Sequence, residues 1–269
     1  MIATDFDYGV CRLSLVSLRA EPAHAAEQTS QLLFGEQYEV TEISPDKKWM
    51  LIRNNYDRFT GWLDARQHHP ISREHFEYLN GANFKIITDI ATSILYNKSP
   101  LQILMGSIIP ISGAELFKME EQFAFNGESK NLGQKRDVEF LKAIAAKYIN
   151  APFMPGGRSP FGIDPSGFIQ LVFKISGYPL GRTIHQQMDD GRPVKEVDEG
   201  KPGDLIFFKS MKDKSLHVGI LLADDKVIHV AEKVRVDHFD EGGILNPDAR
   251  VYTHTFMNAR RILLPEQGS

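Results

Sequence analysis

The 269-residue sequence has a single cysteine, Cys11, and this scarcity excludes two kinds of protein. One thiol cannot form an internal disulfide or supply a cysteine-rich metal site, so the fold does not depend on an oxidising compartment. We therefore expect the protein to be cytoplasmic. Cys11 lies between Val10 and Arg12 in a β-type run, where it is typical of a small core residue rather than a relocated nucleophile.

Long apolar runs and an excess of basic residues are also lacking. The most apolar window, 101–111, is interrupted by Gly106 and Pro110 and is shorter than the roughly 20 residues that a membrane-spanning helix needs. The N-terminus has Asp5 and Asp7 where a signal peptide would have basic residues. Lysine and arginine total 31 against 35 acidic residues, which gives no global attraction to nucleic acid. The sequence thus predicts no membrane span, no signal peptide and no nucleic-acid partner.

The residue pattern changes near residue 130. Residues 8–112 hold short β-type runs between turn residues, without a sustained helical period. The segment QLLFGE at 31–36 recurs weakly as QILMGS at 102–107, which predicts two consecutive β-barrels of about 60 residues each. The polar segment 126–135 is typical of a linker.

Residues after this segment predict an α+β domain. Apolar residues recur at helical spacing over 138–148 and 168–175, and the second helix is expected to end at Gly177. Strand-like runs follow at 204–209, 217–222, 226–231, 234–239 and 261–264. Helices followed by an antiparallel meander indicate α+β architecture. The expected domains are 1–70, 71–130 and 131–269.

Two histidines lie on neighbouring predicted strands. His217 opens the run HVGILL, and His229 lies in VIHV, across a turn at 223–225. An odd-length connection would place both imidazoles on one face of the hairpin, whereas a two-residue turn would place them on opposite faces. Two neighbouring imidazoles can act as a base and its orienting partner beside a thiol or hydroxyl nucleophile. A histidine among apolar residues is also commonly a satisfied core group.

Motifs along nearly the whole chain resemble, in type and order, the NlpC/P60 cysteine peptidases, which are papain-like cell-wall enzymes. These motifs are LRAEP at 18–22, QLLFGE at 31–36, YDRFTGW at 56–62, PFMPGGRSPFGIDPSGF at 152–168, RT at 182–183, QQ at 186–187, GDL at 203–205, HVG at 217–219 and His229. The N-terminal motifs look like bacterial SH3 modules of the subgroup that cleaves γ-D-glutamyl-L-diamino acid bonds in peptidoglycan peptides. The resemblance implies two SH3-like β-barrels, a papain-like α+β domain and a peptidoglycan-derived peptide as partner.

The nucleophile position departs from the family pattern. Where the family has Asp-Cys-Ser-Gly, this sequence has Asp164-Pro165-Ser166-Gly167, and proline has neither a thiol nor a backbone N–H. Aspartate as N-cap and proline at the first helical position make a favourable helix start, so Pro165 suits the fold while removing the family's chemistry. Phe153 replaces the tyrosine whose hydroxyl helps to stabilise the oxyanion in the family.

The resemblance also assigns the other site residues. It makes His217 and His229 the catalytic pair, and it makes Phe59 the counterpart of the family's pocket tyrosine. The groups that hold the ammonium of an N-terminal L-alanine are expected to be Asp164, Ser166 and Glu27. Arg182 is a candidate partner for a ligand carboxylate. The histidines at 68, 69 and 75 lie in a polar connector without a clear ligand set, so we predict no metal site and no cofactor.

Three functions remain open from the sequence. A degenerate NlpC/P60 protein would bind a peptide that begins with L-Ala-γ-D-Glu without hydrolysing it. An active γ-D-glutamyl-L-diamino acid endopeptidase would need Ser166, or a water activated by the two histidines, in place of the thiol. However, a one-residue step at a helix start turns a side chain by about 100°, which argues against Ser166. The third function is a scaffold whose SH3-like barrels bind a protein partner.

Overall fold

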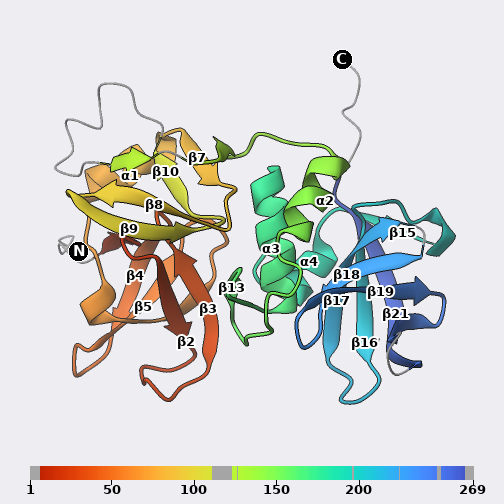
Figure 1. The fold of residues 1–269 in the computed structure, drawn as a ribbon. Helices are drawn as coiled ribbons and strands as arrows, with labels where there is room; N and C mark the ends of the chain where they lie inside the picture. Colours follow the sequence, from red (N-terminus) through yellow and green to blue (C-terminus); the bar gives the residue numbers. More distant parts are fainter. Residues whose placement is uncertain are drawn as a thin grey trace. The chain divides into compact units, whose positions relative to one another are not determined.

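The computed structural model describes residues 7–110, 123–125, 127–195, 197–223, 225–246 and 250–263. The chain divides into two compact units (Figure 1). The first contains residues 1–134 together with 155–160, and the second contains residues 135–154 and 161–269. None of the described helices is long and apolar enough to cross a membrane.

The N-terminal part of the first unit is a six-stranded antiparallel sheet in the order β1-β4-β5-β6-β2-β3. Its strands are β1 (Tyr8–Val10), β2 (Leu15–Arg19), β3 (Gln28–Leu33), β4 (Gln37–Ile43), β5 (Trp49–Asn54) and β6 (Thr60–Asp64), followed by the 3-10 turn η1 (Ala65–Gln67). Inward residues such as Val16 and Leu18 alternate with outward ones along β2, as a half-buried strand requires. Cys11 lies in this core, and burial raises the pKa of its thiol to about 12. The expectation that Cys11 is a core residue is therefore confirmed.

Two three-stranded sheets complete the first unit, in the orders β10-β7-β12 and β11-β8-β9. The elements are α1 (Arg73–Gly81), β7 (Phe84–Ile87), β8 (Ala91–Tyr96), β9 (Ser99–Leu104), β10 (Ile108–Pro110), β11 (Phe123–Phe125) and β12 (Ser129–Asn131). Helix α1 departs from the β-type pattern expected over residues 8–112; it begins at its N-cap Ser72 and buries only Phe76 and Leu79, which is too few for a visible helical period. Strand β12 corrects the expectation that 126–135 is a linker, because it pairs with β7. The boundary between two barrels at residue 70 stays a prediction.

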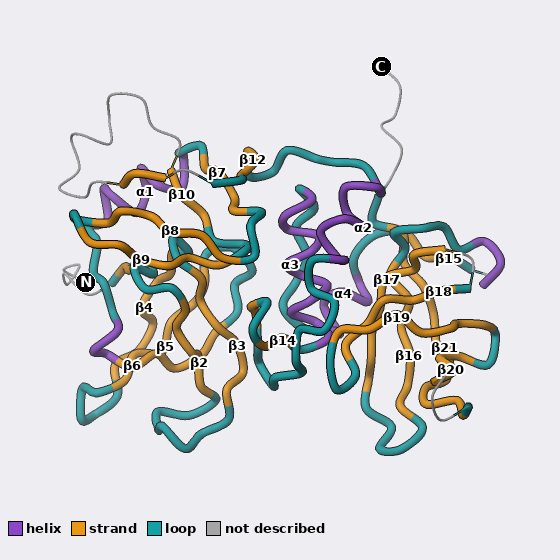
Figure 2. Tube along the Cα trace, in the orientation of Figure 1, coloured by secondary structure: helices purple, strands orange, loops and turns teal. Residues whose placement is uncertain are grey.

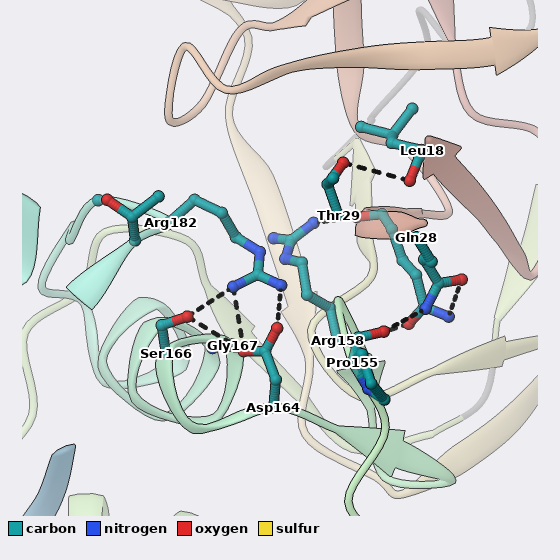
Figure 3. Close-up of polar contacts among 12 residues, drawn as sticks. Leu18, Gln28, Thr29, Pro155, Arg158, Asp164, Ser166, Gly167 and Arg182 are labelled. Carbon is teal, nitrogen blue, oxygen red and sulfur yellow. Dashed lines mark hydrogen bonds and ion pairs between the residues drawn. The ribbon is translucent and has the colours of Figure 1, made fainter. Parts of the chain in front are cut away.

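A short segment of the later sequence, 155–160, folds with the first unit. Its Arg158 is fully buried and donates two hydrogen bonds to the Glu36 carboxylate, at 2.8 and 2.9 Å. The Arg158 N–H donates to Gln31 Oε1 at 2.7 Å, and Gln28 Nε2 donates to the Pro155 carbonyl at 2.9 Å (Figure 3). Gly156 has a φ of +66°, and a side chain there would collide with the Gln28 backbone. Because both charges of the buried pair are hydrogen-bonded, the segment is held without an unpaired buried ion.

The second unit combines helices with a seven-stranded antiparallel sheet in the order β15-β21-β16-β17-β18-β19-β20. Its helices are α2 (Val138–Ala146), α3 (Pro165–Ser176) and α4 (Ile184–Asp189), and Figure 2 shows them on one side of the sheet. The strands of the sheet are β15 (Arg192–Val194), β16 (Leu205–Ser210), β17 (Leu216–Ala223), β18 (Lys226–Val230), β19 (Val234–Asp240), β20 (Gly243–Asn246) and β21 (Val251–Arg261). Short elements of this unit outside the sheet are β14 (Gly162–Ile163) and the 3-10 turn η2 (Val197–Glu199), while β13 (Arg158–Ser159) belongs to the first unit.

This sheet closes on itself, because β21 pairs with both β16 and β20. Buried residues from facing strands, including Phe208, Leu221 and Phe239, form one core cluster. The expected strands within 204–239 are confirmed within two residues. The strand expected at 261–264 is wrong, because β21 runs from Val251 to Arg261 and ends where that strand was expected to begin.

Candidate functional site

Helix α3 begins as the sequence predicts, at an Asp-Pro step. Asp164 is the N-cap, in extended conformation, and its Oδ1 accepts a hydrogen bond from the Gly167 N–H at 2.6 Å. Pro165 occupies the first turn, where its missing N–H has no intrahelical partner. Gly177, in the left-handed region, caps the other end. The helix start is thus complete without any reactive group at position 165.

Arg182 is bound to this helix start. The guanidinium, on a residue 2% exposed, donates to Asp164 through Nη2–Oδ2 at 2.5 Å and Nη1–Oδ1 at 3.1 Å (Figure 3). It also donates to Ser166 Oγ at 2.8 Å. The partner of Arg182 in the structure is therefore an internal carboxylate, and its binding to a ligand carboxylate stays a prediction. Gln187 fixes the same loop by donating to the Ser166 and Gly181 carbonyls, each at 2.9 Å.

The Ser166 hydroxyl is engaged on both sides. It donates to Asp164 Oδ1 at 3.1 Å and accepts the Arg182 bond. A serine nucleophile needs a base to accept its proton, but this proton points at a carboxylate already paired with arginine. Asp164 Oδ1 accepts three hydrogen bonds, whereas among the described residues Oδ2 accepts only from Arg182. One lone pair of Oδ2 is left for a further donor.

Histidines 217 and 229 are brought together as expected. His217 Nε2 lies 2.9 Å from His229 Nδ1, and both residues are buried. Gly219 is the direct partner of His229, so His217, two residues away, shares its face. The reason differs from the expectation. Strand β17 ends at Ala223 and β18 begins at Lys226. This two-residue connection alone would place the two histidines on opposite faces of the hairpin. A bulge between Leu221 and Ala223 shifts the pairing by one residue and returns both histidines to one face.

Asp237 on β19 extends the pair and was missed in the sequence. Its Oδ2 lies 3.1 Å from His229 Nε2, and its Oδ1 accepts from Arg235 Nε at 2.9 Å. Burial raises the pKa of Asp237, but the hydrogen bonds and charges of His229 and Arg235 outweigh burial and hold that pKa below its usual range. The ionised carboxylate can only accept, so His229 carries its proton on Nε2 and accepts at Nδ1. His217 must then donate from Nε2, which leaves its Nδ1 unprotonated and basic.

A third imidazole, His254 on β21, stacks on His217 with ring centroids 4.4 Å apart and planes at 28°. Burial, with the neighbouring His229, lowers the pKa of His254 to about 4. Burial likewise holds the pKa of His217 well below its ordinary value, helped by His229 and His254. At neutral pH the His217 imidazole is therefore neutral, and the lone pair of its Nδ1 is free.

The other predicted site residues lie in separate places. Phe153, in the second unit, is 46% exposed and donates its N–H to the Glu232 carbonyl at 3.0 Å. Glu27 is exposed, and Phe59 packs on the core of the six-stranded sheet; both belong to the first unit. That they share a pocket with Asp164 stays a prediction, as does the orientation of position 165 toward His217. Within the described ranges, no group of three or more His, Cys, Asp or Glu residues is arranged to hold a metal ion.

Comparison with known proteins adds two matches to families. Residues 150–261 match the NlpC/P60 family, and residues 18–67 match the bacterial dipeptidyl-peptidase SH3 domain. The chain is 25% identical over 217 residues to the γ-D-glutamyl-L-lysine dipeptidyl-peptidase of Bacillus subtilis, covering 74% of this chain and 71% of that protein. It is 30% identical over 141 residues to a probable endopeptidase NlpC homolog of Haemophilus influenzae, covering 51% of this chain and 68% of that protein. The crystal structure of an NlpC/P60 family protein from Bacillus cereus has the same fold, with a TM-score of 0.78 at 17% identity, over 96% of this chain and 100% of that one.

Proposed function

Because this chain belongs to the NlpC/P60 family, we propose that it binds peptidoglycan-derived peptides with a free N-terminal L-Ala-γ-D-Glu, without hydrolysing them. The observation that carries the proposal is Pro165 at the first turn of α3, between two polar residues that are retained. Proline offers no nucleophile, and the neighbouring Ser166 hydroxyl is held by Asp164 and Arg182. The family's acyl transfer to a thiol therefore has no counterpart at this position.

The chain retains carboxylates that suit an ammonium group. Asp164 Oδ2, in the second unit, has an open lone pair, and we propose the exposed Glu27 of the first unit as a second carboxylate for the same group. Since Arg182 already neutralises Asp164, most of the attraction for the ammonium is assigned to Glu27. The name of the Bacillus subtilis relative places a γ-D-glutamyl-L-lysine bond in its substrate, which supports this class of peptide for the present chain.

The test compares two peptides by calorimetry, L-Ala-γ-D-Glu-L-Lys and its N-acetylated form. A charged hydrogen bond contributes about 1.5 kcal/mol or more, so the free amine should bind on the order of tenfold more tightly. Glu27→Gln should abolish this preference, whereas Glu21→Gln, in the same exposed loop, should keep it. Equal affinity of the two peptides for the unchanged protein would contradict the proposal.

A second candidate is hydrolysis by a water that His217 activates. The intact chain from His217 through His229 to Asp237 favours it, because this arrangement leaves a basic Nδ1 on His217. Release of L-lysine from the free-amine peptide by the unchanged protein, lost in His217→Ala but kept in Ser166→Ala, would establish this activity. Absence of release, together with the amine preference, supports binding alone.

A further inference from the structure

The first unit contains a hollow whose lining includes none of the predicted site residues. Its volume is about 650 Å³, within the usual range for ligand pockets. Three parts of the six-stranded sheet bound it: the loop before β3, the turn between β4 and β5, and the junction of β6 with η1. The lining residues are Ala23, His24, Asp46, Lys47, Lys48, Trp49, Asp64, Ala65 and Arg66.

One wall of the hollow is apolar. Trp49 begins β5 and is 6% exposed, and the His24 ring meets it edge-on with centroids 5.0 Å apart. Ala23 and Ala65 lie beside them in the lining. A tryptophan with small neighbours can contact the carbon atoms of a ligand, while the charged residues around it set the ligand's polarity.

The two acidic residues of the hollow are already engaged. Asp64 accepts from Arg66 through Nη2–Oδ2 at 2.6 Å and Nε–Oδ1 at 3.0 Å. Asp46 Oδ1 accepts from the Ser44 hydroxyl at 2.7 Å and the Lys48 N–H at 3.1 Å, and the Lys48 ammonium lies 3.8 Å from Oδ2.

Lys47 is the uncompensated charge of the hollow. Among the residues that the structure describes, its ammonium makes no hydrogen bond and no ion pair. The unbalanced charge in the lining is therefore positive, and it suits an anion.

The backbone fixes where Lys47 stands. Its φ is +58°, in the left-handed region, and its N–H donates to the Ser44 carbonyl at 2.8 Å. Asparagine adopts this conformation more readily than lysine. A change of Lys47 to asparagine therefore removes the charge while keeping the turn, which separates binding from folding.

We propose that this hollow binds the carboxylate of a short peptide, with the carboxylate at Lys47 and the adjoining carbon atoms against Trp49. The choice of peptide rests on the proposed function, because a γ-linked D-glutamate keeps its α-carboxylate free. This site would hold a peptide independently of the ammonium at Asp164 and Glu27.

The experiment uses tryptophan fluorescence. The chain has two tryptophans, so Trp62→Phe leaves Trp49 as the single reporter. The probe is N-acetyl-L-Ala-γ-D-Glu with both carboxylates free, which lacks the ammonium. Its diamide and inorganic phosphate, at equal ionic strength, are the comparison ligands. We expect a saturable change with the dicarboxylate and none with the diamide.

Matched lysine variants locate the binding. Lys47→Asn should weaken the dicarboxylate on the order of fivefold, the upper range for an accessible ion pair. Lys98→Asn, at a second lysine with a positive φ of 64° in the same unit, should leave affinity unchanged. Equal affinity of the Lys47 variant, or equal binding of the diamide, overturns the site; tighter binding of phosphate overturns the peptide assignment. Because the probe has no ammonium, equal affinity of the free and N-acetylated peptides for the unchanged protein would refute the proposed function without changing this readout.

Discussion

Within the second unit, polar side chains are used in two contrasting ways, at the start of α3 and in the hydrogen-bonded series His217, His229 and Asp237, called here the histidine chain. At the start of α3, Asp164 caps the helix and pairs with Arg182, so it is satisfied whether or not position 165 is reactive. The histidine chain instead ends at His217 Nδ1, to which none of the described residues donates. The first arrangement serves the fold, and the second prepares a base for which the fold has no use.

This difference explains how position 165 can hold a proline without disturbing the structure around it. A helix start needs an acceptor at the N-cap and tolerates proline next to it. Burying the imidazoles of His217 and His254 is costly for folding at mild acidity, because burial disfavours their charged forms inside the protein. Under the proposed function, the thiol chemistry is missing at position 165 while the histidines that would support it remain.

The largest expected effect comes from Pro165→Cys, which adds a thiol at the start of α3 for the histidine chain to deprotonate. A thiol at a helix N-terminus has a lowered pKa, and His217 can accept its proton. Loss of a nucleophile costs about 10⁶-fold in a triad enzyme, and a missing oxyanion donor costs 10²- to 10³-fold. Because Phe153 lacks the family's hydroxyl, we expect hydrolysis of L-Ala-γ-D-Glu-L-Lys on the order of 10³-fold above background, measured as released L-lysine.

Controls for this variant separate the thiol from the base. Pro165→Ala should remain inactive, and adding His217→Ala to the cysteine variant should remove the gained rate. If the new thiol is alkylated by iodoacetamide yet releases no lysine, position 165 does not face a working base. Turnover by the unchanged protein that Ser166→Ala abolishes would instead revive the serine alternative.

Asp237→Asn in the cysteine variant should have the next largest effect. An asparagine amide can donate to His229 Nε2, which moves the His229 proton to Nδ1 and forces His217 to be protonated at the wrong nitrogen. Replacing the aspartate behind a catalytic histidine with asparagine fixes the wrong tautomer and costs about 10⁴-fold in a serine-protease triad, so we expect a loss of at least about 100-fold. Asp240→Asn, on the same strand and bonded to Tyr252, should leave the rate unchanged. A full rate in Asp237→Asn would contradict the proton arrangement.

Some of the site could have been predicted more fully from the sequence. Strands β18 and β19 are joined by three residues, so the parity argument applied to His217 and His229 also places Asp237 beside His229. His254 was out of reach, because β21 has a weak alternation of buried and exposed residues and was expected at 261–264. The Arg182–Asp164 pair depends on the path of a loop, which no periodicity records.

The fold was predictable where apolar residues repeat regularly. Helix α2 buries a face that follows a helical period, whereas α3 is buried all round from Gly167 to Ser176, and β17 and β18 are almost continuously buried. The docking of 155–160 on the first unit was not predictable, since it depends on Arg158 meeting a carboxylate that is distant in sequence. Long-range ion pairs leave no local pattern.

The smallest expected effect is a loss of stability in mild acid that belongs to the histidine chain and not to the start of α3. Burial lowers the pKa of His217 in the folded chain well below 6.5, its ordinary value in the unfolded chain. Between these two pKa values the unfolded chain binds a proton that the folded chain does not. The free energy of unfolding must therefore fall as the pH drops below 6.5. One such group loses about 1.4 kcal/mol per pH unit, or about 2 kcal/mol by pH 5. The half-exposed His254 adds a smaller amount because solvent screens it.

Urea unfolding at pH 7 and pH 5 measures the difference in the free energy of unfolding. This difference should shrink in His217→Gln and persist in His185→Gln, an exposed histidine on α4. The same acid sensitivity in the His217 variant as in the unchanged protein would show that the buried chain does not control it.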